Sequence, residues 1–436
     1  MASGTKQWDV IVIGAGMAGI LTAYYLKKSG KRVLVLEANE VASGQTGRTT
    51  AKITSQHDLK YRKLIKQIGV RKARLYAEAN EKAINEYEKL IREENIDCQF
   101  KRLSAHLYTR EDKKILWEEA QAAAYLGIDT FFLRESELPF AISSVVGFRN
   151  QAQFSPLDFI RHIAKELEVY EHTKVIKIRG NRIITKDRVL TADKIVVATH
   201  YPIRNVPGFY FMRQHQERSY VLALLGPDKL NGMYLGIDED GISLRQAGDY
   251  LLLGGGSHRT GKNTIGGAYD HLECVARNYF PECEIVAHWS AQDCMPHDGI
   301  PFIGKYSIFT PNLYVATGFQ KWGMTSSMVA AMILRDELCG ERNPYSRVFC
   351  PQRINIRAGM AKFFIDVGES VAGMLKGIFL KEGPRCPHMG CALVWNPNEH
   401  SWDCPCHGSR FEENGGLLDN PAIKGIENVN NNDNYY

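Results

Sequence analysis

Apolar residues near the N-terminus form a short β-forming run, then a helical stripe, then a second β-forming run. The first run extends from Asp9 to Ile13, and the helical periodicity that follows reaches Leu26. The second run extends from Arg32 to Leu36. This strand, helix, strand order predicts the start of a parallel sheet in an α/β domain.

Residues 58 to 96 show one amphipathic helical face. Their apolar positions follow steps of three and four residues, and only Asn80 interrupts the stripe. These positions are Val70, Ala73, Ala77, Ile84, Tyr87 and Ile91. A basic cluster on the same segment consists of Lys60, Arg62, Lys63, Lys66, Arg71, Lys72 and Arg74. It is either a solvated helix face or a docking patch for an acidic redox partner, which long-range charge steering would favour.

Two further helices are predicted in the C-terminal half. A strand beginning at Leu313 leads through a glycine-bearing turn into a helix from about Thr325 to Leu338. Residues 341 to 356 mark the exit from this region, and Ala358 to Leu380 is predicted to be a helical connector with an apolar stripe. The Asn-rich end, residues 428 to 436, is predicted to be disordered.

The composition is that of an ordinary globular protein of two or three domains, since the chain has 436 residues. With 44% hydrophobic and 24% charged residues, neither a disordered nor a membrane protein is indicated. The net charge of +5 is small for this size and argues against nucleic acid as the main partner. We expect no transmembrane segment, because no stretch reaches the ~18 apolar residues of a membrane span. The polar N-terminus leads straight into a strand, so we expect no signal peptide and a cytoplasmic location.

The ten cysteines fall into two groups. Six are scattered without a recurring spacing, which favours a reducing compartment over a secreted disulfide scaffold. These six are Cys98, Cys274, Cys283, Cys294, Cys339 and Cys350. The other four lie close together near the C-terminus.

Two short C-terminal loops carry the spacing of metal ligands. The first reads CPHMGC from Cys386, and the second reads CPCHGS from Cys404. One Cys and one His from each loop can bind a [2Fe-2S] cluster, with the thiolates on one iron and the imidazoles on the other. These ligands would be Cys386, His388, Cys404 and His407. A zinc site is the alternative, because four N and S ligands also suit tetrahedral zinc.

This segment closely resembles the Rieske family, including the extra cysteine in each loop and the HGSRF ending. By this resemblance, Cys391 and Cys406 would form a disulfide across the cluster. Rieske domains usually place several strands before the first ligand loop, whereas only Lys376 to Pro384 precedes it here. We therefore expect a small, abbreviated all-β domain. Either it is supported by the rest of the chain or by another subunit, or its cluster is looser and more exposed than usual.

A glycine-rich turn follows the first β-forming run and reads GAGMAG from Gly14 to Gly19. Gly14 permits the tight turn, Gly16 lets a pyrophosphate approach the backbone, and Gly19 allows close packing of helix on strand. The N-terminus of the helix offers free N–H groups to the phosphates. Glu37 ends the second strand and can hydrogen-bond both hydroxyls of an adenosine ribose. The complete unit predicts a dinucleotide cofactor.

The stretch from Ala42 to Lys52 favours FAD over NAD. Its small, hydroxyl-bearing and glycine residues with one arginine can line a diphosphate and reach toward an isoalloxazine, although a flexible surface loop is the alternative. A second glycine-rich run, Leu253 to His258, lacks a following strand and acid, so we expect it to be a turn near the flavin. The absence of an NAD fingerprint indicates that the electrons come from an organic substrate.

The fingerprint, this loop and the C-terminal half together resemble the D-amino-acid-oxidase-type family of FAD-dependent oxidoreductases over about residues 8 to 340. Residues 194 to 199, 298 to 304 and 313 to 325 resemble the family's strand beside the adenine, its flavin-ring segment and its last strand and helix. The implied fold is a doubly wound FAD-binding domain interleaved with an α+β substrate domain. The implied FAD-binding residues are Gly14, Gly16, Met17, Ala18, Gly19, Glu37, Ala38, Thr46, Gly47, Arg48, Thr49, Thr50, Ala51, Val175, Ala198, Thr199, Gly304, Gly318, Trp322, Gly323, Met324 and Thr325.

Four residues are candidates for catalysis. Lys321, in the turn before the last helix, could place a cation near the flavin N1 or N5. Tyr220, Arg245 and His258 lie on or near predicted strands of the substrate domain, where an arginine could grip a carboxylate and a histidine or tyrosine could handle a proton. For these three, ordinary structural hydrogen bonding is the alternative. A covalent flavin link through Cys294 or His57 can also be considered, but no motif requires it.

A flavin takes two electrons from a C–N or C–O bond, whereas a [2Fe-2S] cluster carries one electron at a time. We therefore expect oxidation of a small organic substrate, by resemblance an amine or amino acid, with electrons passing from FAD to the cluster and then to an external acceptor. The alternatives are an inward current from an external donor through the cluster to FAD, for a reductive or oxygenase reaction, and an electron-transfer module without its own substrate. The predicted boundaries are 1–345 for the FAD-dependent oxidoreductase domain, 346–380 for the linker and connector helix, and 381–436 for the Rieske domain.

Overall fold

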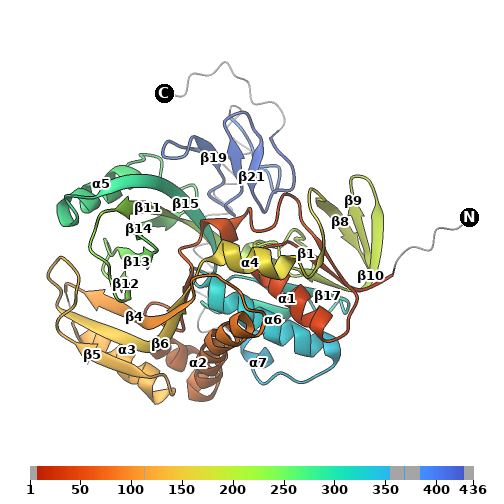
Figure 1. Ribbon diagram of the computed structural model, residues 1–436. Helices are drawn as coiled ribbons and strands as arrows, with labels where there is room; N and C mark the ends of the chain where they lie inside the picture. The colour runs from red at the N-terminus through yellow and green to blue at the C-terminus, as the bar shows by residue number, and fades with distance from the viewer. Residues whose placement is uncertain (1–6, 112, 354–367, 369–382, 427–436) are drawn as a thin grey trace, which may run out of the picture.

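The computed structural model describes residues 7–111, 113–353, 368 and 383–426. Apart from residue 368, the predicted connector helix lies outside the described residues, as does the Asn-rich tail. Three sheets organise the described chain, and they correspond to the three parts visible in Figure 1.

The first sheet holds the dinucleotide fingerprint. At its centre β1 (Trp8–Ile13) pairs in parallel with β2 (Val33–Leu36) and β10 (Val189–Val197). The path is completed by β7 (Glu168–Tyr170), β17 (Leu313–Thr317) and β16 (Phe302–Lys305). Its order is β16-β17-β10-β1-β2-β7, and β16 runs antiparallel to β17 at the edge.

Alternate residues of β1 belong to two different hydrophobic cores, because both faces of a parallel sheet are buried. One core includes α1 (Met17–Lys28), α4 (Pro156–Ala164) and α6 (Gly323–Cys339). The other includes the hairpin of β8 (Val175–Arg179) and β9 (Arg182–Thr185). The predicted α/β class is confirmed, with helices on one face of this sheet and the hairpin on the other.

The second sheet forms the predicted substrate domain. In spatial order it contains β15 (Glu284–Pro296), β11 (Gln214–Leu225), β14 (Tyr250–Arg259), β13 (Ser243–Ala247), β12 (Met233–Gly236), β4 (Lys101–Thr109), β6 (Ser144–Gln153) and β3 (Lys52–Ile53), with β5 (Thr130–Leu133) beside β6. Helix α5 (Ala268–Tyr279) packs on β11 and β14, and α3 (Lys113–Tyr125) packs on β5 and β6. Because the chain returns to the first sheet between β6 and β11, the two parts are interleaved.

Helix α2 (Tyr61–Glu93) confirms the helix predicted over residues 58 to 96, apart from a kink at Gly69. Gly69 has φ 77°, a left-handed conformation that glycine adopts without strain. Asn80 is buried in the stripe because its Nδ2 donates to Tyr76 O at 2.9 Å, which satisfies the side chain inside the helix. Three shorter elements complete the first two parts: η1 (Gln45–Arg48), η2 (Tyr210–Met212) and α7 (Ser346–Phe349).

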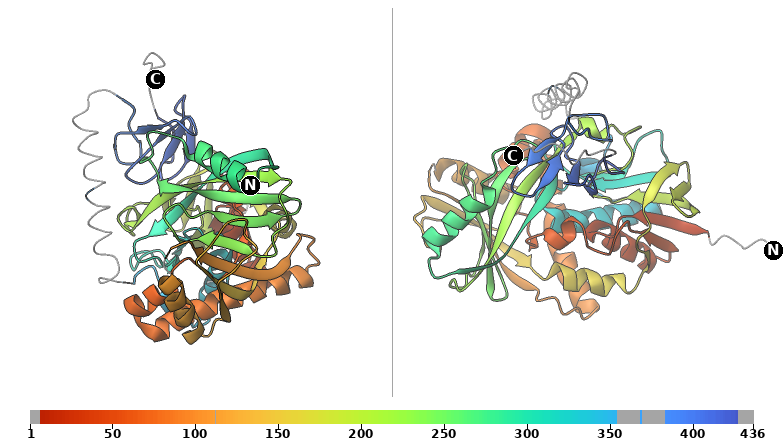
Figure 2. Two further views of the ribbon diagram at one scale, coloured as in Figure 1. Left: turned by 90° about the vertical axis from the view of Figure 1, so that its left-hand side faces the viewer. Right: turned by 90° about the horizontal axis from the view of Figure 1, so that it is seen from above.

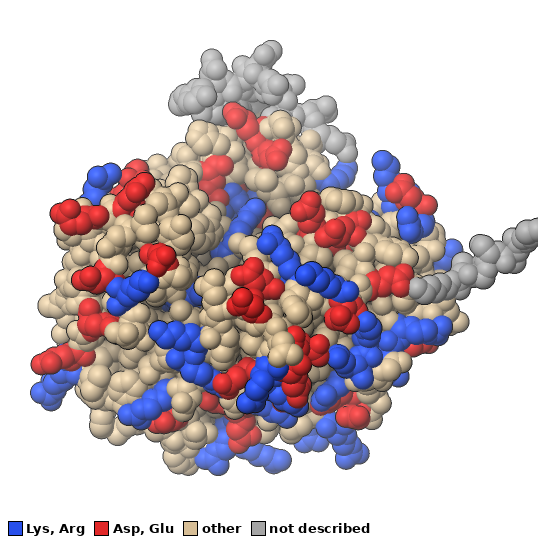
Figure 3. All heavy atoms as spheres, in the orientation of Figure 1, with Lys and Arg blue, Asp and Glu red and all other residues tan. Residues whose placement is uncertain are grey.

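The predicted basic cluster is partly used in internal contacts. Lys60 is buried and donates from Nζ to Gly299 O at 2.6 Å, and Arg62 pairs with Glu118 at 2.7 Å. The prediction that Lys60 belongs to an exposed patch is therefore wrong. Its ammonium can be buried because the hydrogen bond to the carbonyl oxygen of Gly299 offsets the cost of removing the charge from water. Figure 3 shows acidic and basic side chains interspersed over the face in view.

The glycine-rich run from Leu253 to His258 forms part of β14 and is not the predicted turn. Gly254 pairs with Val221 of β11 and with Ser243 of β13, and Gly255 pairs with Tyr220 of β11. A Cβ on Gly255 would lie 3.0 Å from Leu272 Cδ2, so the missing side chain admits α5 close to the strand. The glycines are thus required by close packing within a strand.

The C-terminal part is a small all-β unit, drawn in blue in Figures 1 and 2. Its four antiparallel strands are β18 (Val394–Asn396), β19 (Ser401–Asp403), β20 (Arg410–Glu412) and β21 (Leu417–Asp419). The unit lies against β11 and β15 of the second sheet, which supply the support that its own few strands lack. The predicted abbreviated form is confirmed.

Candidate active site and cluster site

A large cavity lies between the first two sheets. It has a volume of about 1370 Å³, and its walls come from the fingerprint turn, η1, β11, β14, β15 and the turn before α6. Residues 417–420, 422 and 423 of the C-terminal part also line it. All three parts of the chain therefore border one cavity.

The fingerprint turn is fixed by contacts at one end of this cavity. Gly14 has φ 103°, and a Cβ there would lie 2.5 Å from a backbone carbonyl oxygen that follows β10, so only glycine fits. Ala15 N donates to Glu37 Oε2 at 2.7 Å, and Met17 N donates to Thr46 Oγ1 at 3.0 Å. Glu37 and Thr46 line the cavity beside the N-terminus of α1. This arrangement fits the adenosine and diphosphate of FAD.

Most of the predicted FAD-binding residues line the cavity. They are Gly14, Gly16, Met17, Ala18, Glu37, Ala38, Thr46, Arg48, Thr49, Thr50, Val175, Ala198, Thr199, Gly318, Trp322, Gly323 and Met324. Those placed behind its wall are Gly19, Gly47, Ala51, Gly304 and Thr325. A Cβ on Gly19 would lie 1.9 Å from Gly14 O, so Gly19 serves helix packing. A Cβ on Gly304 would meet Pro351 at 3.3 Å, beside α7 and away from the cavity.

The four predicted catalytic residues divide into two pairs. Lys321 and Tyr220 line the cavity, whereas Arg245 and His258 do not. Arg245 is buried on β13 and donates to the carbonyl oxygens of Thr50 and of a residue that follows β6. His258 Nε2 lies 3.0 Å from Tyr220 Oη, and burial lowers the pKa of His258. Arg245 and His258 thus make the structural hydrogen bonds that were the alternative interpretation.

Two further candidates for flavin contact differ in position. His57 lines the cavity and stacks on Trp322 with ring centroids 4.9 Å apart. Burial holds the pKa of His57 well below its usual value, so its imidazole is neutral at physiological pH. Cys294 faces away from the cavity, with Sγ 3.5 Å from His200 O. Cys294 is therefore poorly placed for a covalent flavin link.

Three charged side chains meet where β11, β15 and the turn before α6 border the cavity. Glu217 and Asp293 are directly opposite each other on the two strands, and both line the cavity. Lys321 Nζ lies 3.8 Å from Glu217 Oε2 and donates a hydrogen bond to Ser257 Oγ. Burial raises the pKa of Asp293 to about 7, an effect that Glu217 increases and Lys321 opposes.

The two C-terminal loops bring their predicted ligands together in like pairs. The thiols of Cys386 and Cys404 contact each other, and the rings of His388 and His407 have centroids 5.1 Å apart. His388 Nε2 donates to Asn205 Oδ1 at 2.8 Å, and its Nδ1 is buried without a hydrogen-bond partner among the described residues. Because Nε2 carries the proton, Nδ1 has the free lone pair that an iron requires. Two thiols and two imidazoles fit a Rieske cluster.

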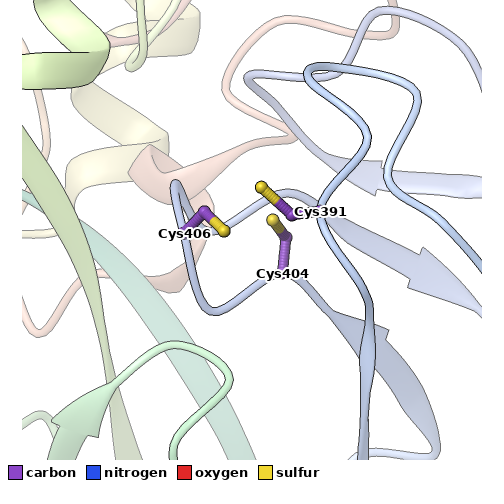
Figure 4. Close-up of side chains that lie close together, drawn as sticks. All are labelled: Cys391, Cys404 and Cys406. Atoms are coloured by element: carbon purple, nitrogen blue, oxygen red, sulfur yellow. The ribbon is translucent and has the colours of Figure 1, made fainter. Parts of the chain in front are cut away.

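The two surplus cysteines lie beside these ligands. The Sγ atoms of Cys391, Cys404 and Cys406 are all within 4.8 Å of one another (Figure 4). All ten cysteines are among the described residues, and no disulfide joins any two of them in this structure. The disulfide between Cys391 and Cys406 therefore stays a prediction, with its two thiols in close proximity.

Strands β11 and β15 separate the cavity from the cluster loops. Because side chains alternate along a strand, Glu217 and Asp293 face the cavity while Gln216 and Gln292 face the C-terminal part. Gln216 Nε2 donates to His407 O at 2.8 Å, and Gln292 Nε2 donates to the carbonyl oxygen of Gly408 at 2.8 Å. A single layer of sheet, which we call the β11–β15 wall, stands between the cavity and a cluster ligand.

Arg218 anchors the C-terminal part to this wall. Its side chain is 0% exposed and binds Glu399 through two nitrogens, with Nε 3.0 Å from Oε2. Its third nitrogen lies 3.8 Å from Asp419, which lines the cavity. Arg410 of the C-terminal part completes the network at 3.0 Å from Glu399. Burial opposes ionisation of Glu399, but Arg218 and Arg410 hold its pKa below the usual value.

Comparison with known families agrees with this geometry. The family model described as FAD dependent oxidoreductase (DAO) matches residues 9–337, and the Rieske [2Fe-2S] domain model matches residues 376–430. The chain belongs to the DAO family of FAD-dependent oxidoreductases. It is a Rieske-type member of that family, with FAD and a [2Fe-2S] cluster as cofactors, and the zinc alternative is set aside.

This DAO-family flavoprotein is similar to the Rieske 2Fe-2S iron-sulfur protein YhfW of Bacillus subtilis (strain 168). The two sequences are 36% identical over 475 aligned residues, and the alignment covers 97% of this chain and 93% of YhfW. Its fold is similar to that of glycine oxidase from Geobacillus kaustophilus, with a TM-score of 0.68 and 18% identity over 80% of this chain and 100% of that chain. L-proline dehydrogenase from P. horikoshii gives a TM-score of 0.67 and 16% identity over 80% of this chain and 98% of that chain.

Two cofactors define what the flavoprotein can do chemically. FAD would supply a two-electron acceptor, and the cluster would supply a one-electron carrier. None of the helices described in the structure is long and apolar enough to cross a membrane.

Sequence reasoning missed several residues of the site. Asp293, Glu217, Asn205 and Arg218 belong to no motif. The one available signal was the polar run QHQERS at the start of β11, which precedes the apolar run YVLALL in the same strand. Such a change of character within one strand indicates that its first half packs against something other than an apolar core.

Proposed function

We propose that the flavoprotein oxidises a small amine or amino acid at FAD and passes the electrons singly through its Rieske cluster to an external acceptor. The observation that carries this proposal is the β11–β15 wall, which has cavity residues on one side and the backbone of His407 on the other. Residues 417–420 of the Rieske part also line the cavity. The names of the fold relatives glycine oxidase and L-proline dehydrogenase support an amine or amino acid as substrate.

Each part of the chain has a role in this proposal. Glu37, Thr46 and the fingerprint turn would hold the adenosine and diphosphate, and Lys321 would place positive charge beside the flavin ring. The proposed functional boundaries are 1–345 for substrate oxidation, 346–380 for the connection and 381–436 for electron transfer. Because the contacts of the Rieske part are internal to one chain, electron transfer needs no second subunit.

Anaerobic titration with a panel of amines and amino acids, followed by visible and EPR spectroscopy, tests the proposal. One compound is expected to bleach the flavin and to evoke a Rieske EPR signal in the same sample. The Cys404→Ser variant is the control, because it removes a proposed cluster ligand and should keep flavin bleaching without the EPR signal. A wild-type protein whose flavin bleaches while the cluster stays oxidised would contradict the proposed direction of electron flow.

A further inference from the structure

Asp293 is a carboxylate of the cavity that the cofactor contacts leave unused. Asp293 lines the cavity from β15, and within the described chain its side chain forms neither a hydrogen bond nor a salt bridge. The backbone on both sides of it is fixed. Gln292 N donates to Gln45 Oε1 at 2.8 Å, and Gln320 N donates to Cys294 O at 2.9 Å. Asp293 is thereby held between η1 and the turn before α6.

The charges around Asp293 favour a cation. Glu217, opposite Asp293, is already paired with Lys321 at 3.8 Å and with His215 at 3.2 Å. Arg218 lies on the other face of β11, where it pairs with carboxylates of the Rieske part. The two carboxylates and the one ammonium that border this part of the cavity leave one negative charge, because Lys321 balances only one of them.

The same region lacks the group that would best hold an anion. Arg48 is the sole arginine among the described residues that line the cavity, and it interacts with Asp419 of the Rieske part. Arg245 lies behind the wall of the cavity and is engaged with backbone carbonyls. The described part of the chain therefore places no bidentate arginine clamp for a substrate carboxylate beside Asp293.

We infer that Asp293 is a catalytic residue that binds the substrate's amino group as an ammonium ion and then accepts one of its protons. The inference rests on the proposed amine oxidation. In this step an N–H bond breaks, its electron pair stays on the nitrogen, and the proton bonds to a carboxylate oxygen. The nitrogen lone pair can then form the C=N bond as the adjacent hydrogen leaves as a hydride, for which FAD is the acceptor.

The electrostatic setting of Asp293 suits this role. Burial raises its pKa to about 7, so both protonation states are accessible near neutral pH. An arriving ammonium ion stabilises the carboxylate, and the loss of a proton from the nitrogen removes that stabilisation. The same side chain can therefore bind the cation and accept its proton.

Three probes that share a tert-butyl group test the binding step without turnover. The tert-butylammonium ion has no hydrogen on the carbon that bears nitrogen, so it can bind but cannot be oxidised. Its neutral and anionic counterparts are tert-butanol and pivalate. At pH 8 the holoprotein is expected to bind tert-butylammonium at least about 10-fold more tightly than either counterpart, as judged by perturbation of the flavin absorbance.

Substitution assigns this preference to Asp293. In Asp293→Asn, tert-butylammonium binding should weaken about 10- to 100-fold, which corresponds to the loss of a hydrogen bond to a charged group. Asp293→Glu should keep the preference for the cation. Asp240→Asn is the matched control, because Asp240 is an exposed acid that also borders the cavity. Its affinity should stay within about 2-fold of the wild type.

A wild-type protein that prefers pivalate or binds none of the three probes overturns the inference, as does an Asp293→Asn variant that binds like the wild type.

A second measurement needs no variant. The affinity of the wild type for tert-butylammonium should fall by about 10-fold per pH unit below pH 7, because Asp293 is protonated there. The charged and titratable groups around Asp293 are Lys321, Glu217, His215 and Arg218. Constant affinity from pH 8 to pH 5 would also refute the inference. Because no electron moves in these experiments, their result is independent of the proposed electron path.

Discussion

Single side chains in this flavoprotein function through partners from distant parts of the chain. His388 of the Rieske part donates to Asn205, which precedes η2 in the oxidoreductase part. Asp293 owes its high pKa to burial at the meeting point of three elements. At this scale the properties of a proposed cluster ligand or of a buried carboxyl group are set by residues from other parts of the chain.

The hydrogen bond from His388 to Asn205 is expected to tune the cluster. A hydrogen bond accepted from Nε2 makes the imidazole a stronger donor to iron and favours the oxidised cluster. Asn205→Leu should therefore raise the reduction potential by about 40 mV, the equivalent of about 1 kcal/mol for one electron. Asn205→Asp should lower it. Redox titration monitored by EPR measures both, and equal potentials in the two variants would contradict the role of Asn205.

Asp293 is expected to make folding stability depend on pH. Its pKa is about 7 in the folded protein and 3.8 in an unperturbed chain. Between these values the unfolded chain releases a proton that the folded protein keeps, so this carboxyl destabilises the fold progressively as pH rises from about 4 to 7. Asp293→Asn should unfold at a higher temperature than the wild type at pH 8, with a gain of at most about 4 kcal/mol, and should match it near pH 4. Thermal unfolding at both pH values is the check, and an unchanged difference would be evidence against the raised pKa.

The motif residues could be predicted because their chemistry is local. Gly14 needs a positive φ within its own turn, and the loop that begins at Cys386 carries its ligands within a few residues. Asp293 could not be predicted, because its orientation depends on the register of β15 against β11. The glycines from Leu253 to His258 predict a turn, but the run is a strand, because its conformation also depends on contacts with distant residues. Glycine spacing alone does not show that α5 packs closely on a strand.

Two strands provide the connection between the cofactor sites. Along β11 and β15, alternate residues face the cavity or the Rieske part, so the same short segments contribute to both sites. The Rieske part packs closely on β11 at Gly408, because a Cβ on Gly408 would lie only 2.6 Å from Gln216 Cβ. At the scale of elements, the β11–β15 wall fixes the Rieske part relative to the cavity.

Loss of Arg218 is expected to release the Rieske part from the wall. Arg218→Met would leave Glu399 and Asp419 buried with less compensating charge, which typically costs about 3 to 5 kcal/mol. We expect faster cleavage of the C-terminal part in limited proteolysis, with flavin absorbance unchanged. Arg62→Met is a control, because Arg62 of α2 forms a partly exposed pair with Glu118 of α3, away from the Rieske part. Equal cleavage rates in both variants would argue against anchoring by Arg218.

The pH dependence of this anchoring has the opposite sign to that of Asp293. The pKa of Glu399 and that of Asp419 are lowered in the folded protein, because nearby arginines outweigh the effect of burial. Their contribution to stability is therefore complete above the usual pKa of a free carboxyl and is lost as pH falls through the lowered values. Resistance of the wild type to proteolysis should be constant from pH 8 to pH 6 and should fall only in acid. Weakening of the anchor already at pH 6 would contradict this assignment.

At the scale of the whole molecule, the three parts of the chain border one cavity. Figure 2 shows the Rieske part, in blue, lying against the green strands of the second sheet. The α/β FAD part and the small Rieske part could be predicted from separate motifs. Their mutual placement could not be predicted, because it depends on a polar interface of glutamines and buried ion pairs without a sequence pattern. This placement supports the proposal that the flavoprotein converts two-electron into one-electron chemistry within a single chain.

We propose that FAD and the cluster exchange electrons within one chain across the β11–β15 wall. Flash photoreduction of the flavin under anaerobic conditions, with cluster reduction followed over a tenfold range of protein concentration, tests it without knowledge of the substrate. We expect the cluster to be reduced after the flavin, at a rate that is independent of protein concentration. A rate that rises in proportion to protein concentration, or a cluster that stays oxidised, would contradict it.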